Sequence, residues 1–164
     1  MTYLLIAFVL AVILSPLMWF RQSPRQKLIT AMRQHAAAKG LRVKLSKPAD
    51  AREGEGRLEY VTYLLPWSPG SDPSSEARME KWLLIKETDR GDPSPWPEWR
   101  WRGRKSNDRL TSTIGAVLEG LPKTVAALEA YSEGVRIYWQ ERGDLEEIEL
   151  VSRQLSILKG VIRS

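Results

Sequence analysis

The stretch LEYVTYLL, residues Leu58–Leu65, decides the fold class of this 164-residue chain. It is rich in β-branched and aromatic side chains, which favour the pleated and half-buried surface of a β-strand. Stretches dense in Pro, Gly, Ser and Asp separate it from further strand patterns, at Leu41–Leu45, Met79–Lys86, Glu98–Arg104 and Val135–Gln140. Because short loops join consecutive strands, the sequence predicts a mainly antiparallel sheet of four or five strands.

Helical patterns lie on both sides of these strands. Ser followed by Pro at positions 23 and 24 is typical of a helix start, and this helix is expected to run to residue 39. Two more helices are predicted over residues 108–120 and 122–131, and a last one follows Asp144. The last helix has an apolar face with steps of three and four, formed by Ile148, Val151, Leu155, Leu158 and Ile162. The chain is therefore predicted to be an α+β domain whose helices cover the sheet.

Composition excludes several classes of chemistry. The chain has no Cys and one His, His35, so disulfides, cysteine-ligated metals and two-histidine metal motifs are ruled out. No glycine-rich phosphate loop and no G-x-S-x-G motif is present. The acidic residues after Asp144 begin a helix, where carboxylates complement the helix dipole. We therefore expect no catalytic residues, no metal and no cofactor.

Tyr3–Phe20 is an uncharged run of 18 residues. As a helix it would cover roughly 27 Å, which is close to the ~30 Å hydrocarbon core of a bilayer. Trp19 lies at its end, where an indole ring suits the water interface. A signal peptide would need basic residues before the run and a small-residue cleavage site, and a buried core helix is the other alternative. We predict a transmembrane anchor over residues 1–20, followed by one small domain.

Basic residues follow this run. Residues 21–47 contain eight Lys and Arg side chains and no acidic one, so the positive-inside rule places the N-terminus outside and the domain in the cytoplasm. The chain is thus predicted to be a single-pass protein of the bacterial inner membrane, with a basic juxtamembrane helix and first strand at 21–47 and a cytoplasmic α+β domain at 41–164. Anionic lipid headgroups attract such cations; the alternative is a solvated linker. The residues predicted to contact lipid are Trp19, Arg21, Arg25, Lys27 and Arg33.

The stretch WPEWRWRGRK, residues 96–105, combines indole rings with guanidinium groups. In an extended chain Trp99 and Trp101 share one side, and arginines occupy the other. Three interpretations are open: an edge strand with Trp inward, a membrane or partner contact, and stacking on single-stranded nucleic acid. Nucleic acid is disfavoured because most of the basic excess lies at residues 21–47. The candidate contact residues are Trp96, Trp99, Arg100, Trp101 and Arg102.

Two motifs after the apolar run carry a resemblance. Residues 20–28 read FRQSPRQKL and residues 39–43 read KGLRV. With the run before them they resemble uncharacterised small single-pass bacterial inner-membrane proteins, some of them labelled as preprotein translocase accessory subunits. The resemblance implies membrane class and topology only, since the remaining chain is much longer than the soluble part of the small translocase subunit.

These observations together predict a membrane-anchored, non-enzymatic interaction module. Its expected partners are the lipid bilayer, anionic lipid headgroups and a protein at the membrane. One alternative is an accessory factor for membrane-protein insertion or secretion. Another is a membrane-tethered enzyme with an Asp/Glu site.

Overall fold

The computed structural model describes residues 3, 4, 6, 8, 23–52, 54, 57–67 and 81–164. Within these residues seven strands form one sheet, in the order β1-β2-β7-β6-β3-β5-β4, and every pairing is antiparallel. The strands are β1 (Arg42–Ser46), β2 (Tyr60–Pro66), β3 (Trp82–Lys86), β4 (Asp92–Pro93), β5 (Trp99–Trp101), β6 (Val125–Tyr131) and β7 (Gly134–Trp139). The α+β class is thus confirmed.

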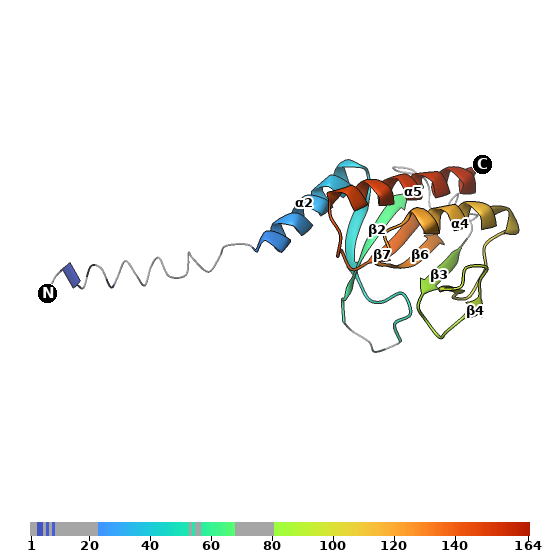
Figure 1. The fold of residues 1–164 in the computed structure, drawn as a ribbon, viewed down its shortest axis with the longest axis horizontal. Helices are drawn as coiled ribbons and strands as arrows, with labels where there is room; N and C mark the ends of the chain where they lie inside the picture. The colour runs from blue at the N-terminus through green and yellow to red at the C-terminus, as the bar shows by residue number, and fades with distance from the viewer. Residues whose placement is uncertain are drawn as a thin grey trace.

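Three helices of the described part of the chain lie on one face of this sheet (Figure 1). They are α2 (Pro24–Ala38), α4 (Thr111–Gly120), which the short 3-10 helix η1 (Asp108–Leu110) precedes, and α5 (Leu145–Arg163). The predicted start of α2 is confirmed by a capping box, in which Ser23 Oγ accepts from Gln26 N at 3.2 Å and Gln26 Oε1 accepts from Ser23 N at 3.1 Å. The Asp144 carboxylate caps α5 by accepting from Glu146 N at 2.9 Å and from Glu147 N at 3.2 Å.

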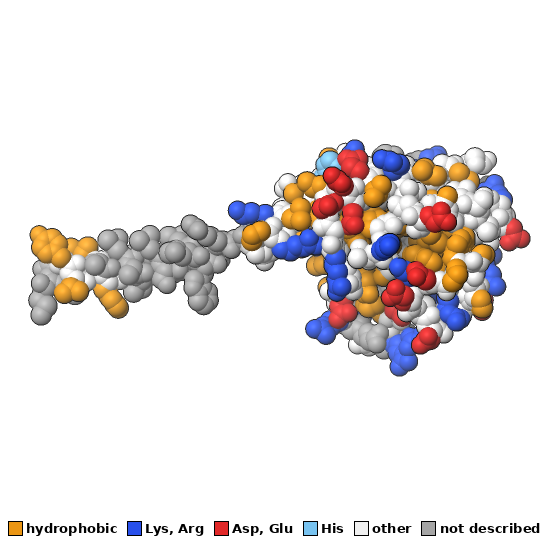
Figure 2. Space-filling view, viewed as in Figure 1, with side chains coloured by type: hydrophobic (Ala, Val, Ile, Leu, Met, Phe, Trp, Pro, Cys, Tyr) orange, Lys and Arg blue, Asp and Glu red, His pale blue; other side chains and the backbone are white. Residues whose placement is uncertain are grey.

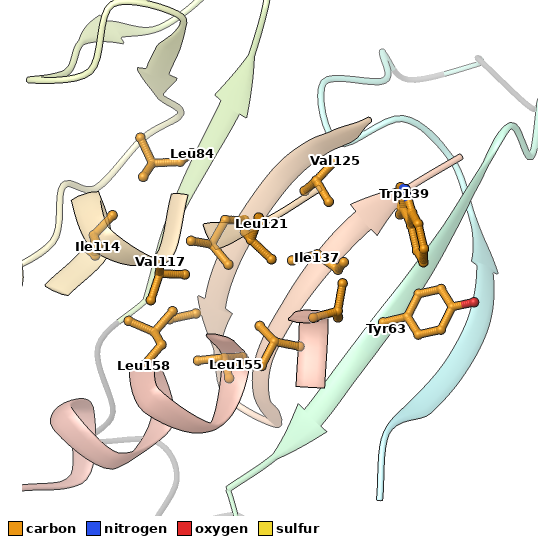
Figure 3. Packing of buried hydrophobic residues seen from close by; sticks show 14 of the residues in the cluster. Tyr63, Leu84, Ile114, Val117, Leu121, Val125, Ile137, Trp139, Leu155 and Leu158 are labelled. Atoms are coloured by element: carbon orange, nitrogen blue, oxygen red, sulfur yellow. The ribbon is translucent and has the colours of Figure 1, made fainter. Parts of the chain in front are cut away.

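The hydrophobic core fills the space between the helices and the sheet. Leu155 and Leu158 point from α5 toward the strands that carry Ile137 and Val125 (Figure 3). The predicted apolar face of α5 is confirmed, because all five of its members are buried. This shared core holds α5, α4 and the sheet together as one packed unit.

The predicted helix over residues 122–131 is wrong, because Val125–Tyr131 forms strand β6. The sequence VAALEAY has good helix formers, but β6 occupies the middle of the sheet, where β7 and β3 pair with it on both sides. Tertiary pairing overrides the local preference. β4 was also not predicted, and with both additions the described residues form a sheet of seven strands instead of four or five.

The predicted membrane anchor is also corrected. Among the described residues no helix is both long enough and apolar enough to cross a membrane. The longest of them, α5, has 19 residues but carries charged side chains along its length. This finding contradicts the transmembrane helix, the single-pass topology and the inner-membrane location. Of residues 3–20 the structure describes only 3, 4, 6 and 8, and both Trp19 and Arg21 lie outside the described residues.

Candidate interaction surface at the basic edge of the sheet

Arg25 and Arg33, two of the residues predicted to contact lipid, bind the loop between β7 and α5. The Arg25 guanidinium donates to the carbonyl oxygens of Glu141 and Gly143, the latter at 3.0 Å. Arg33 donates through Nε and a terminal nitrogen to the two carboxylate oxygens of Glu141, at 2.8 and 2.6 Å. Both arginines are therefore engaged in attaching α2 to the rest of the domain.

Glu141 is the centre of this contact. Its side chain is only 4% exposed, and one of its oxygens also accepts from the Tyr63 hydroxyl at 2.6 Å. Burial, together with the neighbouring carboxylate, raises the pKa of Tyr63, and the hydrogen bond to Glu141 raises the pKa of Arg33. The carboxylate is thus paired and hydrogen-bonded, which is what a buried charge requires. We interpret the cluster as structural.

A second polar contact holds the other end of α2. His35 Nε2 lies 2.6 Å from Glu149 Oε1, and Lys39 Nζ lies 3.0 Å from Glu149 Oε2. The bonds from His35 and Lys39 lower the pKa of Glu149. Sequence reasoning found no carboxylate for His35 within its own helix, because the partner comes from α5, 114 residues later.

Glu147, in the first turn of α5, has fewer hydrogen-bond partners than Glu141 and Glu149. Its Oε2 atom is buried and has no hydrogen-bond partner among the described residues. Burial, and then the nearby Asp144 carboxylate, raise the pKa of Glu147 above its usual 4.5. The native state therefore binds this proton more tightly than the unfolded state. The resulting stabilisation is complete below pH 4.5 and is lost as the pH rises through the native pKa.

Replacing Glu147 with Gln is therefore expected to stabilise the protein at neutral pH, by about 1 kcal/mol, since a carboxylate with one buried and unpartnered oxygen loses its charge. The variant should also lose less stability than the wild type between acidic and neutral pH. Urea unfolding across that range measures both effects. Glu146→Gln, exposed in the same helical turn, is the matched control for the lost helix-dipole interaction. A Glu147→Gln variant that is no more stable than Glu146→Gln would contradict the prediction.

Strand β1 forms one edge of the sheet. Among the described residues it pairs only with β2. Val43 and Leu45 lie opposite Tyr63 and Val61, on the side that the helices cover, so the alternating Arg42 and Lys44 lie on the other side. Leu45 is 60% exposed, which is unusual for a leucine inside a strand. The edge thus offers both backbone groups and apolar surface.

Cations lie in β1, directly after it, and in α2, the helix that precedes it. Four exposed side chains here form no ion pair within the part of the chain that the structure describes: Lys27, Arg42, Lys44 and Lys47. Residues 23–47 contain no acidic residue. Blue Lys and Arg side chains gather at this end of the domain, where α2 begins (Figure 2). We call β1 with these four cations the basic edge.

The tryptophans of β5 are part of the core. Trp99 and Trp101 are 8% and 4% exposed, and Trp101 meets Trp82 edge-to-face with ring centroids 5.7 Å apart. Arg100 and Arg102 lie on the other side; Arg100 donates to the Gly91 carbonyl at 3.3 Å. Of the three interpretations of this stretch, the structure has the strand with Trp inward and Arg outward. These two indole rings are therefore buried in the core and contribute almost nothing to the surface of the domain.

Sequence reasoning missed a polar cluster on the face opposite the helices. Arg136 Nε donates to Glu129 Oε2 at 2.5 Å, and the Tyr138 hydroxyl donates to the same oxygen at 2.9 Å. The Arg136 guanidinium also lies 4.0 Å from the centroid of the Tyr131 ring. Burial raises the pKa of Tyr138. The helix prediction over residues 122–131 hid the cluster, because only a β6–β7 hairpin places Glu129 opposite Arg136.

The described residues contain no group of three or more His, Asp or Glu side chains that could hold a metal ion. Glu141 and Glu129, two carboxylates that each accept from more than one side chain, are already paired with Arg33 and Arg136. The basic edge instead offers unpaired charge and strand backbone.

No protein-family model, curated protein or solved structure matches this chain. The resemblance of residues 20–43 to inner-membrane proteins is thus neither supported nor opposed by a known relative.

Proposed function

We propose that this domain is a protein-interaction module whose basic edge binds an extended acidic segment of a partner protein. The observation that carries the proposal is the position of β1 at the end of the sheet, with unpaired cations around it. The outer side of an edge strand presents N–H and C=O groups that have no partner. A peptide that adds as one more strand satisfies these groups with its own backbone.

The alternation in β1 predicts the pattern of the partner. An added strand places successive side chains on opposite faces of the sheet. On one face they would meet Arg42 and Lys44, and on the other Val43 and the exposed Leu45. The segment that fits best therefore alternates acidic with apolar residues. Each cross-strand pair of opposite charges contributes roughly 0.2–1 kcal/mol.

The same cations select against a second copy of this chain. Charged side chains on edge strands commonly prevent edges from pairing with one another. Two copies of β1 would bring Arg42 and Lys44 near like charges, whereas an acidic strand meets opposite charges. The positive charge therefore opposes self-association and favours an acidic partner.

A fluorescent peptide that alternates Glu with Val is expected to bind the full chain, and its Lys–Val counterpart is not. Replacing Arg42 and Lys44 with Glu should weaken binding about tenfold, because two attractions become repulsions and 1.4 kcal/mol corresponds to tenfold. Fluorescence anisotropy measures both results. The matched control reverses Arg104 and Arg153, which are exposed elsewhere on the domain, and should bind as the wild type does. Unchanged affinity of the Arg42→Glu, Lys44→Glu variant would refute the role of the cations.

Strand addition is tested separately from charge attraction. A Glu–Val peptide with N-methyl groups on alternate residues keeps its charge but loses the N–H donors of one edge. We expect this peptide to bind far more weakly than the unmodified one. If both peptides bind equally well, charge attraction holds the peptide and strand addition is wrong.

A further inference from the structure

A second binding site lies away from the basic edge, between β5 and α4. A cavity of about 460 Å³ opens there to the surface, within the size range of small-molecule sites. Two indole rings, Trp96 and Trp99, and three aliphatic side chains, Leu118, Leu121 and Val125, are among the residues that line it. The walls are therefore aromatic and aliphatic, which suits an apolar group of the ligand.

The shape of this cavity depends on Gly115 of α4. A Cβ atom at this position would lie 2.9 Å from the indole nitrogen of Trp96, so only glycine lets the ring lie against the helix. The backbone around Trp96 is fixed as well. Its N–H donates to Ser94 Oγ at 3.1 Å, and its carbonyl accepts from Trp99 N at 3.0 Å. The aromatic wall is thus held in place before any ligand binds.

The rim of the cavity carries one unpaired charge of each sign. Lys86 is satisfied, because its ammonium lies 3.4 Å from the Glu98 carboxylate and donates to the Lys123 carbonyl at 3.1 Å. The exposed side chains of Glu119 and Lys123 also line the cavity, and neither forms an ion pair with a described residue. A ligand with a single charge would meet one favourable and one unfavourable group.

From these features we infer that the cavity binds a free α-amino acid with an aromatic or branched apolar side chain. The side chain occupies the space between Trp96 and Leu118. The ammonium group of the ligand pairs with Glu119, and its carboxylate pairs with Lys123. This site is independent of the basic edge, which lies on another part of the sheet and recognises a polypeptide.

The test uses L-phenylalanine as the probe and the full chain labelled with nitrogen-15. Titration is expected to shift the indole N–H resonance of Trp96, which the Trp96→Phe variant identifies by its loss. Two analogues each lack one charge: 3-phenylpropanoate has no ammonium group, and phenethylamine has no carboxylate. Each should bind two- to fivefold more weakly, the range expected for one exposed ion pair.

Variants locate the site. Glu119→Gln and Lys123→Gln, both at exposed positions, should each weaken phenylalanine binding about two- to fivefold. Glu133→Gln, exposed in the β6–β7 turn, should leave binding unchanged. Gly115→Ala should abolish the shift, and its far-ultraviolet circular dichroism shows whether it has folded. An unmoved Trp96 resonance at millimolar phenylalanine would overturn the inference, as would equal binding of phenylalanine and 3-phenylpropanoate.

Discussion

Replacing Glu141 with Gln is expected to lower the free energy of unfolding by about 2–3 kcal/mol. Breaking a buried ion pair by removing one partner costs roughly 3–5 kcal/mol. We expect a smaller loss in stability here because the Arg33 side chain is 39% exposed. The variant leaves Arg33 without its counter-charge and weakens the acceptor of the Tyr63 hydroxyl. Chemical denaturation, with the unfolding followed by tryptophan fluorescence, measures the loss.

The part of the protein that loses stability distinguishes this cluster from an ordinary surface contact. Because Glu141 attaches α2 to the sheet, amide hydrogens of Pro24–Ala38 should exchange faster in Glu141→Gln, whereas those of α5 should change little. Glu149→Gln is the matched control, since Glu149 also binds α2 but is 44% exposed, and its effect should be clearly smaller than that of Glu141→Gln because exposed ion pairs contribute little. Equal losses in the two variants would contradict a central role for Glu141.

Elements with strong local signals could be predicted from the sequence. The capping box at Ser23 and the apolar spacing of Ile148 to Ile162 act within one helix, so local reasoning found α2 and α5. The helix prediction over residues 122–131 was wrong for the opposite reason, because β6 is determined by distant residues. Val125, Leu128 and Tyr131 are spaced as on a helix, but an irregularity between Val125 and Ala127 and the pairing with two neighbouring strands decide its conformation.

For the candidate sites too, features set by neighbouring residues could be predicted and those set by distant residues could not. Strand alternation correctly places Trp99 and Arg100 on opposite faces of the sheet, because successive side chains of an extended chain always point to opposite faces. The partner of Arg33 is 108 residues away, and no local pattern connects the two. The anchor prediction depended on the length and hydropathy of residues 3–20, together with Trp19 and the basic residues that follow, and no helix among the described residues is both long and apolar enough. The Trp96 cavity required α4 and β5 to be placed together.

Replacing Trp101 with Ala is expected to lower the free energy of unfolding by about 3–5 kcal/mol, the usual loss for a buried aromatic residue. Its ring is 4% exposed and packs against the rings of Trp82 and Trp96, with centroids 5.7 and 6.0 Å away. The mutation therefore leaves a large cavity under two other indole rings. Urea unfolding measures the stability, and near-ultraviolet circular dichroism reports the lost aromatic packing.

Arg102→Gln is the matched control, because Arg102 follows Trp101 directly and its side chain is exposed. It should change the free energy of unfolding by no more than about 0.5 kcal/mol, as surface substitutions usually do. A core residue and a residue that only contacts a partner predict different effects of this mutation on the free energy of unfolding. If Trp101 served mainly to touch a partner, its loss would leave the free protein nearly as stable as the wild type. A loss below about 1 kcal/mol in Trp101→Ala would therefore contradict the assignment of Trp101 to the core.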